Sequence, residues 1–179
     1  VLENEGVNTD GITAVDDAFT TLAFVSLDED ANRSFSFSRK PGADTCLRLN
    51  KVQEEIIQAT RVLHFGTLSL TDEPARSSTM RAVEQAKAQG SIVSFDPNVR
   101  LDLWSSRDEL VRQIEWGIHH CDVLKASEED LAFYDTRPPE EVVIDLLRGG
   151  TIALALLSQG ADGSNAYWRT ADGQIRTSH

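Results

Sequence analysis

From about residue 50 onwards, the chain alternates between short apolar runs and amphipathic stretches with helical spacing. The apolar runs predict strands at 61–65, 91–95, 122–124 and 151–157. The amphipathic stretches predict helices at 50–59, 72–89, 107–118 and 138–148, and a shorter helix that starts after Ser127. Strands and helices that alternate at this spacing favour right-handed crossovers and a largely parallel sheet. The pattern therefore predicts an α/β fold.

The first 45 residues have a different pattern. Thr20–Leu27 and Ser34–Arg39 are rich in β-forming residues, and the polar segment Asp28–Arg33 between them predicts a hairpin turn. In the second strand Phe35 and Phe37 alternate with serines, which suits a half-exposed sheet such as a flap over a site. We therefore expect a β-rich segment with lid strands at 1–45 and an α/β core at 46–179.

Composition narrows the classes of function. With 179 residues and 40% hydrophobic content, the chain can bury one substantial core. Its net charge of -12 argues against binding to duplex nucleic acid or to an anionic membrane surface. The two cysteines, Cys46 and Cys121, do not have disulfide-framework or zinc spacing, and the longest apolar run, Ile152–Leu157, is too short to span a bilayer. We expect a protein of the cytoplasm.

The most informative segment is Ser94–Arg100, where a predicted strand ends at Asp96-Pro97. Proline disfavours continued regular structure, and the turn presents the polar side chains of Asp96, Asn98 and Arg100 within five residues. The carboxyl end of a parallel strand is where α/β sheets bind ligands. This combination indicates a phosphorylated or sugar-like ligand; the alternative is an ordinary Asp-Pro turn with a surface arginine.

Two further segments follow predicted strands. Lys125–Asp130 is a candidate for holding a metal through an acid or a water shell, or else it is a well-capped helix start. Ser158–Gly163 contains glycines that would let the backbone approach a nucleotide, or else it is a plain hairpin turn. Because parallel strands share a direction, both segments should lie at the same sheet edge as Asp96–Arg100.

Five segments then occur in the order of a known family: 6–11, 35–44, 64–70, 94–100 and 125–130. Together they resemble the ribokinase-like (PfkB) sugar kinases, most closely the bacterial fructokinases. The resemblance implies a Rossmann-like three-layer α/β/α domain with a small β-lid. It also implies transfer of the ATP γ-phosphoryl group to a sugar hydroxyl, here the 6-hydroxyl of fructose.

On the sugar side, the resemblance implies that Phe37 and Arg39 on the lid strand contact the sugar. Asp96 and Arg100 are assigned to the substrate, and Asn98 to the neighbourhood of the transferred phosphate. Arg100 is also the catalytic candidate, because a guanidinium stabilises charge on the equatorial oxygens during phosphoryl transfer.

On the nucleotide side, Ser158, Gly160 and Gly163 match the family's Thr-x-Gly-x-x-Gly loop, with serine retaining the hydroxyl. Ser127 and Asp130 occupy the positions of its Asn-x-x-Glu motif, which organises Mg²⁺ and phosphate. Both side chains are shorter than the family's residues. We therefore expect Asp130 to contact the metal through a water molecule and not directly.

Two family motifs would lie outside the chain. The early Gly-Gly motif would precede Val1, and the Gly-Ala-Gly-Asp motif with the catalytic base and anion hole would follow His179. We therefore expect a fold that is incomplete at both ends, the central part of a kinase. Without the base and its donors, this chain alone is expected to lack useful kinase activity.

Several alternatives stay open on sequence grounds. Other substrates of the same fold are 2-keto-3-deoxygluconate, ribose and nucleosides, and the substituted Ser127 and Asp130 also suit a non-catalytic nucleotide- or sugar-binding homologue. ATP and Mg²⁺ are the implied cofactors, and a monovalent cation is a further candidate. The Phe35 and Phe37 face serves either to cap the substrate or to form a homodimer through the lid.

Overall fold

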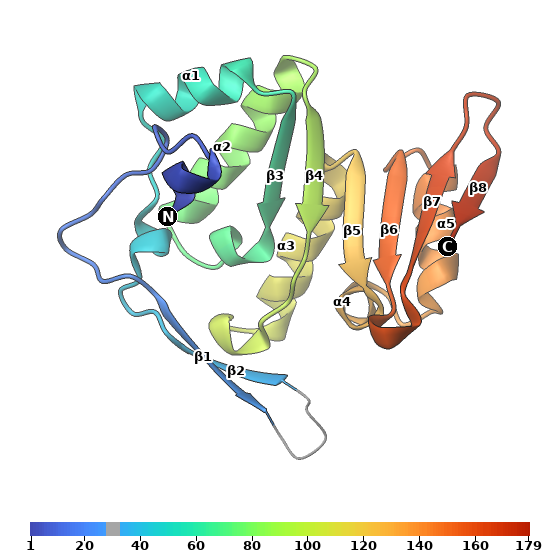
Figure 1. The fold of residues 1–179 in the computed structure, drawn as a ribbon. Helices are drawn as coiled ribbons and strands as arrows, with labels where there is room; N and C mark the ends of the chain where they lie inside the picture. Colours follow the sequence, from blue (N-terminus) through green and yellow to red (C-terminus); the bar gives the residue numbers. More distant parts are fainter. Residues whose placement is uncertain (28–32) are drawn as a thin grey trace.

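The computed structural model describes residues 1–27 and 33–179, and its main feature is a six-stranded sheet (Figure 1). The strands follow one another in sequence order across the sheet. The first four are parallel and the last two antiparallel. Their bounds are β3 Val62–Gly66, β4 Ile92–Asp96, β5 Val123–Ser127, β6 Leu154–Ser158, β7 Ser164–Arg169 and β8 Ile175–Ser178. The predicted α/β fold with a largely parallel sheet is confirmed.

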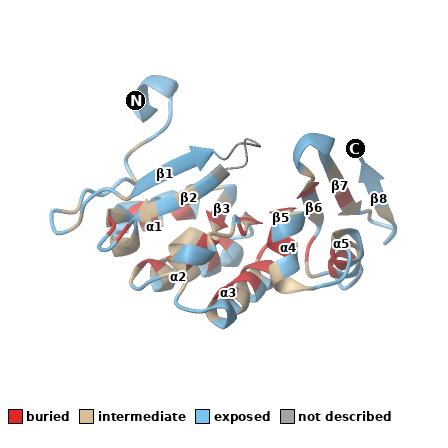
Figure 2. Ribbon diagram, turned by 90° about the horizontal axis from the view of Figure 1, so that it is seen from below, coloured by how far each residue is buried: buried red, intermediate tan, exposed pale blue. Residues whose placement is uncertain are grey.

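Helices precede or follow each parallel strand and gather on one face of the sheet (Figure 2). Their bounds are α1 Lys51–Ala59, α2 Ala75–Ala88, α3 Arg107–His120, α4 Glu128–Tyr134 and α5 Pro139–Arg148. Short 3-10 helices lie at Leu2–Glu5, Ala43–Cys46, Thr67–Leu70, Leu101–Leu103 and Gly160–Asp162. The predicted helices are all present, with ends shifted by a few residues.

Side-chain caps explain where several helices begin. Asn50 and Gln53 form a reciprocal capping box at the start of α1, and Ser106 accepts a hydrogen bond from the Glu109 N–H at the start of α3. Pro74 directly precedes α2 and lacks the N–H that a helix start leaves unpaired. These local signals can be read from the sequence.

The core lies between the helices and the buried side of the strands. Val93 and Phe95 of β4 alternate with partly exposed residues, as expected for a sheet with one covered face. Phe95 is fully buried and packs directly against the backbone of α3 at Gly117. A Cβ atom added at Gly117 would lie 2.4 Å from the Phe95 ring, so the close approach of helix and sheet requires glycine there.

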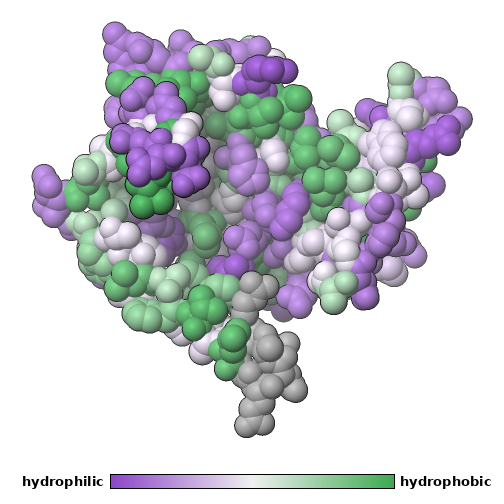
Figure 3. Space-filling model, viewed as in Figure 1, coloured by the Kyte–Doolittle hydropathy of each residue, from purple (hydrophilic) through white to green (hydrophobic). Residues whose placement is uncertain are grey.

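The other face of the sheet is more exposed and partly apolar. Val62 of β3, Ile92 of β4 and Leu156 of β6 are 53%, 48% and 39% exposed. Figure 3 shows hydrophobic side chains gathered over this side of the sheet. His64 also lies in a strand with its side chain exposed, where its Nδ1 is 3.2 Å from the Ser94 Oγ. His64 is therefore an exposed residue of the sheet and not a packed core residue.

Strands β1 Leu22–Leu27 and β2 Arg33–Ser38 form a separate antiparallel pair that projects beyond the carboxyl ends of β3 and β4 (Figure 1). The predicted pairing of the two hairpin strands is confirmed, and the role of the hairpin as a lid stays a prediction. Its predicted turn at Asp28–Arg33 lies outside the described residues, except for Arg33, the first residue of β2. Val25 lies opposite Phe35 and Ala23 opposite Phe37, so the two phenylalanines share one face of the lid.

Two strand boundaries differ by three residues from the predicted ones. Strand β5 extends to Ser127, so Lys125–Ser127 belongs to the strand and the chain enters α4 with almost no loop. Strand β6 starts at Leu154 and not at Thr151, because the chain leaves α5 through Gly149 and Gly150 before it joins the sheet. Among the described residues, no helix has the length and apolar character needed to cross a membrane.

Candidate functional site

The three predicted site segments meet at one edge of the sheet. β4, β5 and β6 are adjacent and parallel, so the segments that follow them leave the sheet side by side. Ser127 pairs directly with Ser158 in the register of β5 and β6. The prediction that Asp96–Arg100, Lys125–Asp130 and Ser158–Gly163 share an edge is confirmed.

Asp130 connects two of these segments. Its Oδ1 accepts a hydrogen bond from the Val99 N–H at 2.8 Å. Its Oδ2 accepts from the Ser127 N–H at 3.1 Å and from the Ser127 hydroxyl at 2.7 Å, and the Ser127 Oγ accepts from the Asp130 N–H. Asp130 is 8% exposed. Both carboxylate oxygens thus bind protein donors, which is how the start of α4 holds the segment that carries Asn98 and Arg100.

Asp96 and Asn98 line a cavity of about 270 Å³ at the ends of β3 and β4. The Asp96 Oδ2 lies 2.9 Å from the Lys125 Nζ, and its Oδ1 accepts a hydrogen bond from the Asn98 N–H. Asn98 has a φ of 41°, in the left-handed region that few residues other than glycine adopt. Such backbone conformations occur often at functional sites, where surrounding contacts maintain them.

A contact between Arg100 and Phe35 brings the lid to this edge of the sheet. The Arg100 guanidinium carbon lies 4.5 Å from the centroid of the Phe35 ring, and its Nη1 donates to the Val99 carbonyl at 2.7 Å. Phe35 in turn stacks on Phe37, with ring centroids 6.2 Å apart. The aromatic face of the lid therefore turns toward the sheet edge and covers Arg100.

The segment after β6 leads into the antiparallel strand β7, so it is also a hairpin turn. Gly160 and Gly163 have φ values of 60° and 94°, which fold the backbone back and require glycine. Ser158 donates to the Ala126 carbonyl at 3.3 Å. Gln159 donates to the Glu128 carboxylate at 3.0 Å, which ties this segment to the start of α4.

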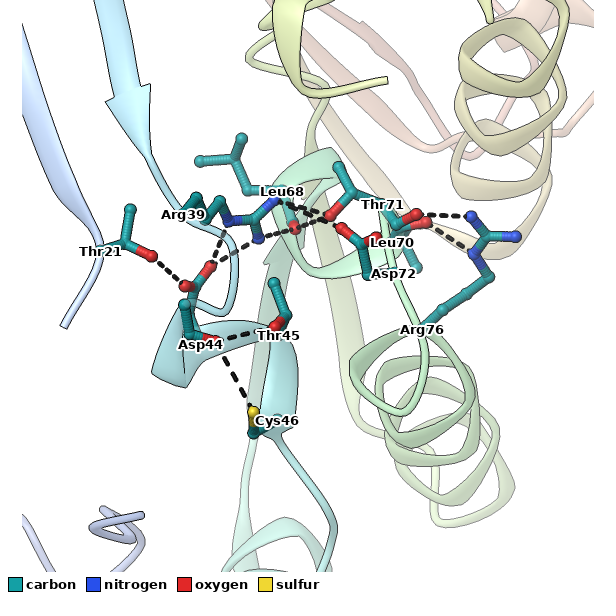
Figure 4. Close-up of polar contacts among 11 residues, drawn as sticks. Thr21, Arg39, Asp44, Thr45, Cys46, Leu68, Leu70, Thr71, Asp72 and Arg76 are labelled. Carbon is teal, nitrogen blue, oxygen red and sulfur yellow. Dashed lines mark hydrogen bonds and ion pairs between the residues drawn. The ribbon is translucent and has the colours of Figure 1, made fainter. Parts of the chain in front are cut away.

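Arg39 fixes the base of the lid (Figure 4). Arg39 is 7% exposed, and its guanidinium donates to the Asp44 carboxylate, the Thr71 hydroxyl and the Leu68 carbonyl. Thr21 also donates to Asp44. Burial raises the pKa of Asp44, but the hydrogen bonds from Arg39 and Thr21 outweigh burial, so the pKa of this carboxyl lies below its ordinary value.

A larger cavity of about 570 Å³ lies beside this network, between the base of the lid and the turn before α2. Phe37 and Arg39 line it together with Lys40, Asp72 and residues of the 101–103 helix. Because the Arg39 donors already bind protein oxygens, the described contacts give Arg39 a structural role. Its contact with a sugar stays a prediction, as does that of Phe37.

Three contacts of the site were not predicted. Phe35 covers Arg100, Lys125 pairs with Asp96, and the fully buried Thr67 donates to the Pro97 carbonyl at 2.5 Å. The alternation that marked Phe35 and Phe37 as one face of a strand was visible in the sequence. The partners of these side chains were not visible, because they lie 29 to 65 positions away in the chain.

Comparisons with known proteins agree with this geometry. The model of the pfkB family carbohydrate kinases matches residues 1–178. A probable fructokinase-4 of Arabidopsis thaliana is 35% identical over the whole chain, which covers 55% of that protein. The chain thus spans about half the length of the curated relatives it matches.

Solved structures give the same result. The structure of a fructokinase with bound ATP from Xylella fastidiosa has a TM-score of 0.79 and 33% identity, over 99% of this chain and 56% of that one. A double mutant of the fructokinase from Vibrio cholerae O395, in a form with fructose, ADP and potassium bound, has a TM-score of 0.79 and 30% identity, over 99% and 56%. These matches confirm the ribokinase-like fold, and the chain belongs to the pfkB family of carbohydrate kinases.

Proposed function

We propose that the protein carrying this chain is an ATP-dependent sugar kinase that phosphorylates fructose at its 6-hydroxyl. One observation carries the proposal: the segments after β4, β5 and β6 meet at one sheet edge, below a lid whose aromatic face covers Arg100. A sugar and a nucleotide can lie side by side at such an edge, with the transferred phosphoryl group between them. The similarity to fructokinases supports fructose as the acceptor.

Arg100 would stabilise the charge that develops on the phosphoryl group. Among the described residues Arg100 forms no ion pair, so none of their carboxylates offsets its positive charge. Its guanidinium presents planar N–H donors that suit phosphoryl oxygens. The Asp130 contact to Val99 holds the backbone next to Arg100, so the arginine starts from a defined position.

On the sugar side, Asp96 would accept a hydrogen bond from a sugar hydroxyl while Lys125 and the Asn98 N–H hold its carboxylate. Phe37 would pack against the apolar face of the sugar ring from the lid. We assign Arg39 to the same wall of the sugar pocket, where it lines the larger cavity.

On the nucleotide side, Ser127, Ser158 and the turn with Gly160 and Gly163 would lie along the ATP, and Asn98 near its γ-phosphate. Mg²⁺ would arrive with the ATP phosphates as part of the substrate. The described residues contain no group of three or more His, Cys, Asp or Glu that could hold a metal ion, and both Asp130 oxygens accept hydrogen bonds. The residues thus fit a water-mediated contact and do not fit direct ligation by Asp130.

Three further features belong to the proposal. A monovalent cation is a candidate activator, since a related fructokinase is known in a potassium-bound form. We place the enzyme in the cytoplasm, which suits two cysteines that are both free. The Phe35 and Phe37 face would cap the sugar, and a homodimer through the lid stays a prediction that light scattering can test.

The test is a substrate panel with Mg-ATP and the purified protein that carries this chain. We expect sugar-dependent ADP formation with the highest kcat/KM for fructose, and a product phosphorylated at the 6-position by NMR. Preference for 2-keto-3-deoxygluconate, ribose or a nucleoside would correct the substrate. Nucleotide binding by calorimetry without turnover on any acceptor would refute the kinase and favour a binding protein.

A further inference from the structure

Arg100 is held in an unusual way for a group that must meet a phosphoryl anion. Its guanidinium carbon lies 4.5 Å from the Phe35 ring centroid, and one of its N–H groups donates to the Val99 carbonyl. A carboxylate partner would fix the arginine more firmly but would also neutralise it. An aromatic face attracts a cation through its quadrupole and leaves the net charge and the N–H edges available.

The lid supplies this aromatic face from a defined position. Phe35 is half-buried on β2, and its ring stacks on that of Phe37 at an interplanar angle of 11°. Four residues further along, the buried Arg39 binds Asp44 and the segment after β3 and fixes the base of the lid. The lid therefore has a firm anchor at its base and one contact with the catalytic candidate farther out.

We propose that Phe35 is a positioning residue, which holds the Arg100 guanidinium over the sheet edge and couples closure of the lid to placement of the phosphoryl-binding charge. When the lid is closed, Arg100 lies under the ring at the site of transfer. When the lid opens, the arginine loses the ring and gains side-chain freedom. This inference rests on the proposed kinase function for its catalytic consequence, but the contact itself does not depend on turnover.

The first test compares Phe35→Leu with Phe35→Trp in the protein that carries this chain. Leucine keeps apolar volume and removes the π face, so we expect kcat with fructose to fall roughly 3- to 30-fold while KM for ATP changes little. Tryptophan retains the π face and should restore most of kcat. Phe24→Leu is the matched control, because Phe24 lies on the other face of the hairpin and is 59% exposed; we expect kcat within about twofold of the parent.

A double-mutant cycle distinguishes positioning from a general effect on the lid. In an Arg100→Gln background, Phe35→Leu should cause no further loss of kcat, because the group that it positions is gone. Independent losses that multiply in the double variant would overturn the inference. Equal effects of Phe35→Leu and Phe24→Leu would overturn it as well.

Amide hydrogen exchange supplies a measurement without turnover. Phe35→Leu and Arg100→Gln should each speed exchange in Ser34–Ser38, and the double variant should exchange no faster than the single ones. Exchange at the parent rate in Phe35→Leu would refute the contact whatever the substrate. Absence of kinase activity on every acceptor, with the exchange result as expected, would refute only the proposed function and would leave a lid contact to an arginine.

Discussion

Replacing Asp130 by Asn tests whether its carboxylate holds the Arg100 segment. The carboxylate accepts hydrogen bonds from the Val99 N–H, the Ser127 N–H and the Ser127 hydroxyl, at 2.8, 3.1 and 2.7 Å. An asparagine side chain has one oxygen and one NH₂ group, so at least one backbone N–H would face another donor. The substitution keeps the size of the side chain, which leaves packing nearly unchanged.

The expected cost follows from the strength of these bonds. Hydrogen bonds to a charged group contribute about 1.5–3 kcal/mol each, and an unpaired buried donor adds a desolvation cost. Asp130 is 8% exposed, so water cannot easily replace the lost partner. We expect Asp130→Asn to lower the free energy of unfolding by about 2–3 kcal/mol. With a urea m-value of about 2 kcal/mol/M, the unfolding midpoint would fall by about 1 M.

Glu129→Gln is the matched control for this experiment. Glu129 is exposed in the same first turn of α4, so its substitution removes the same favourable charge near the helix N-terminus. The loss of this charge lowers the stability by about 0.3–1 kcal/mol and is common to both variants. Urea unfolding at neutral pH should show a clearly larger loss for Asp130→Asn. Equal midpoints for the two variants would mean that the three hydrogen bonds add nothing beyond helix-end charge, and our reasoning would be refuted.

Three other predictions concern the core, the base of the lid and the site. Gly117→Ala should destabilise the fold by about 1–3 kcal/mol in thermal unfolding, because the methyl group of the alanine collides with Phe95. This cost exceeds the gain from the better helix propensity of alanine. Unchanged stability would contradict the close packing. The lowered pKa of Asp44 stabilises the folded state above the unfolded pKa of about 4, and this contribution is lost as the pH falls through the folded pKa. Asp44→Asn should therefore lose less stability between neutral and acidic pH than the parent protein does. If stability falls equally with pH in both proteins, Arg39 does not stabilise the charged form of Asp44. Arg100→Lys should lower kcat with fructose about 10²-fold with a smaller change in KM, since lysine cannot offer the planar donors; an unchanged kcat would remove Arg100 from catalysis.

The secondary structure and part of the site could be predicted because their causes are local. The Asn50 and Ser106 caps lie next to the turns that they stabilise, and the Asp96-Pro97 step ends β4 through its own backbone restrictions. The sequence also predicted that three segments share one edge, since the carboxyl ends of parallel strands lie on the same side of the sheet. The extension of β5 to Ser127 was missed, because a strand that runs directly into a capped helix contains no loop residues to mark its end.

The partners of individual side chains could not be predicted. The family resemblance assigned Arg39 on the lid to a sugar contact, which stays a prediction. In the fold its guanidinium binds Asp44, Thr71 and the Leu68 carbonyl, and the sequence did not indicate these partners (Figure 4). Thr71 is 32 positions away, and nothing in a local pattern selects it among the other threonines. Such pairings depend on how the lid and the strand ends approach each other, which many distant contacts decide together.

By itself the sequence determined the alternation of strands and helices, the lid hairpin, the family and the polar segment that contains Asp96, Asn98 and Arg100. These features arise from periodicity, turn chemistry and ordered motifs, all of which act over a few residues. Tertiary structure alone decided that Asp130 would hold the backbone at Val99 and that Phe35 would cover Arg100. The physical reason is that a hydrogen bond or a cation–π contact depends on distance in space, and the fold brings together groups that the chain keeps about 30 and 65 positions apart.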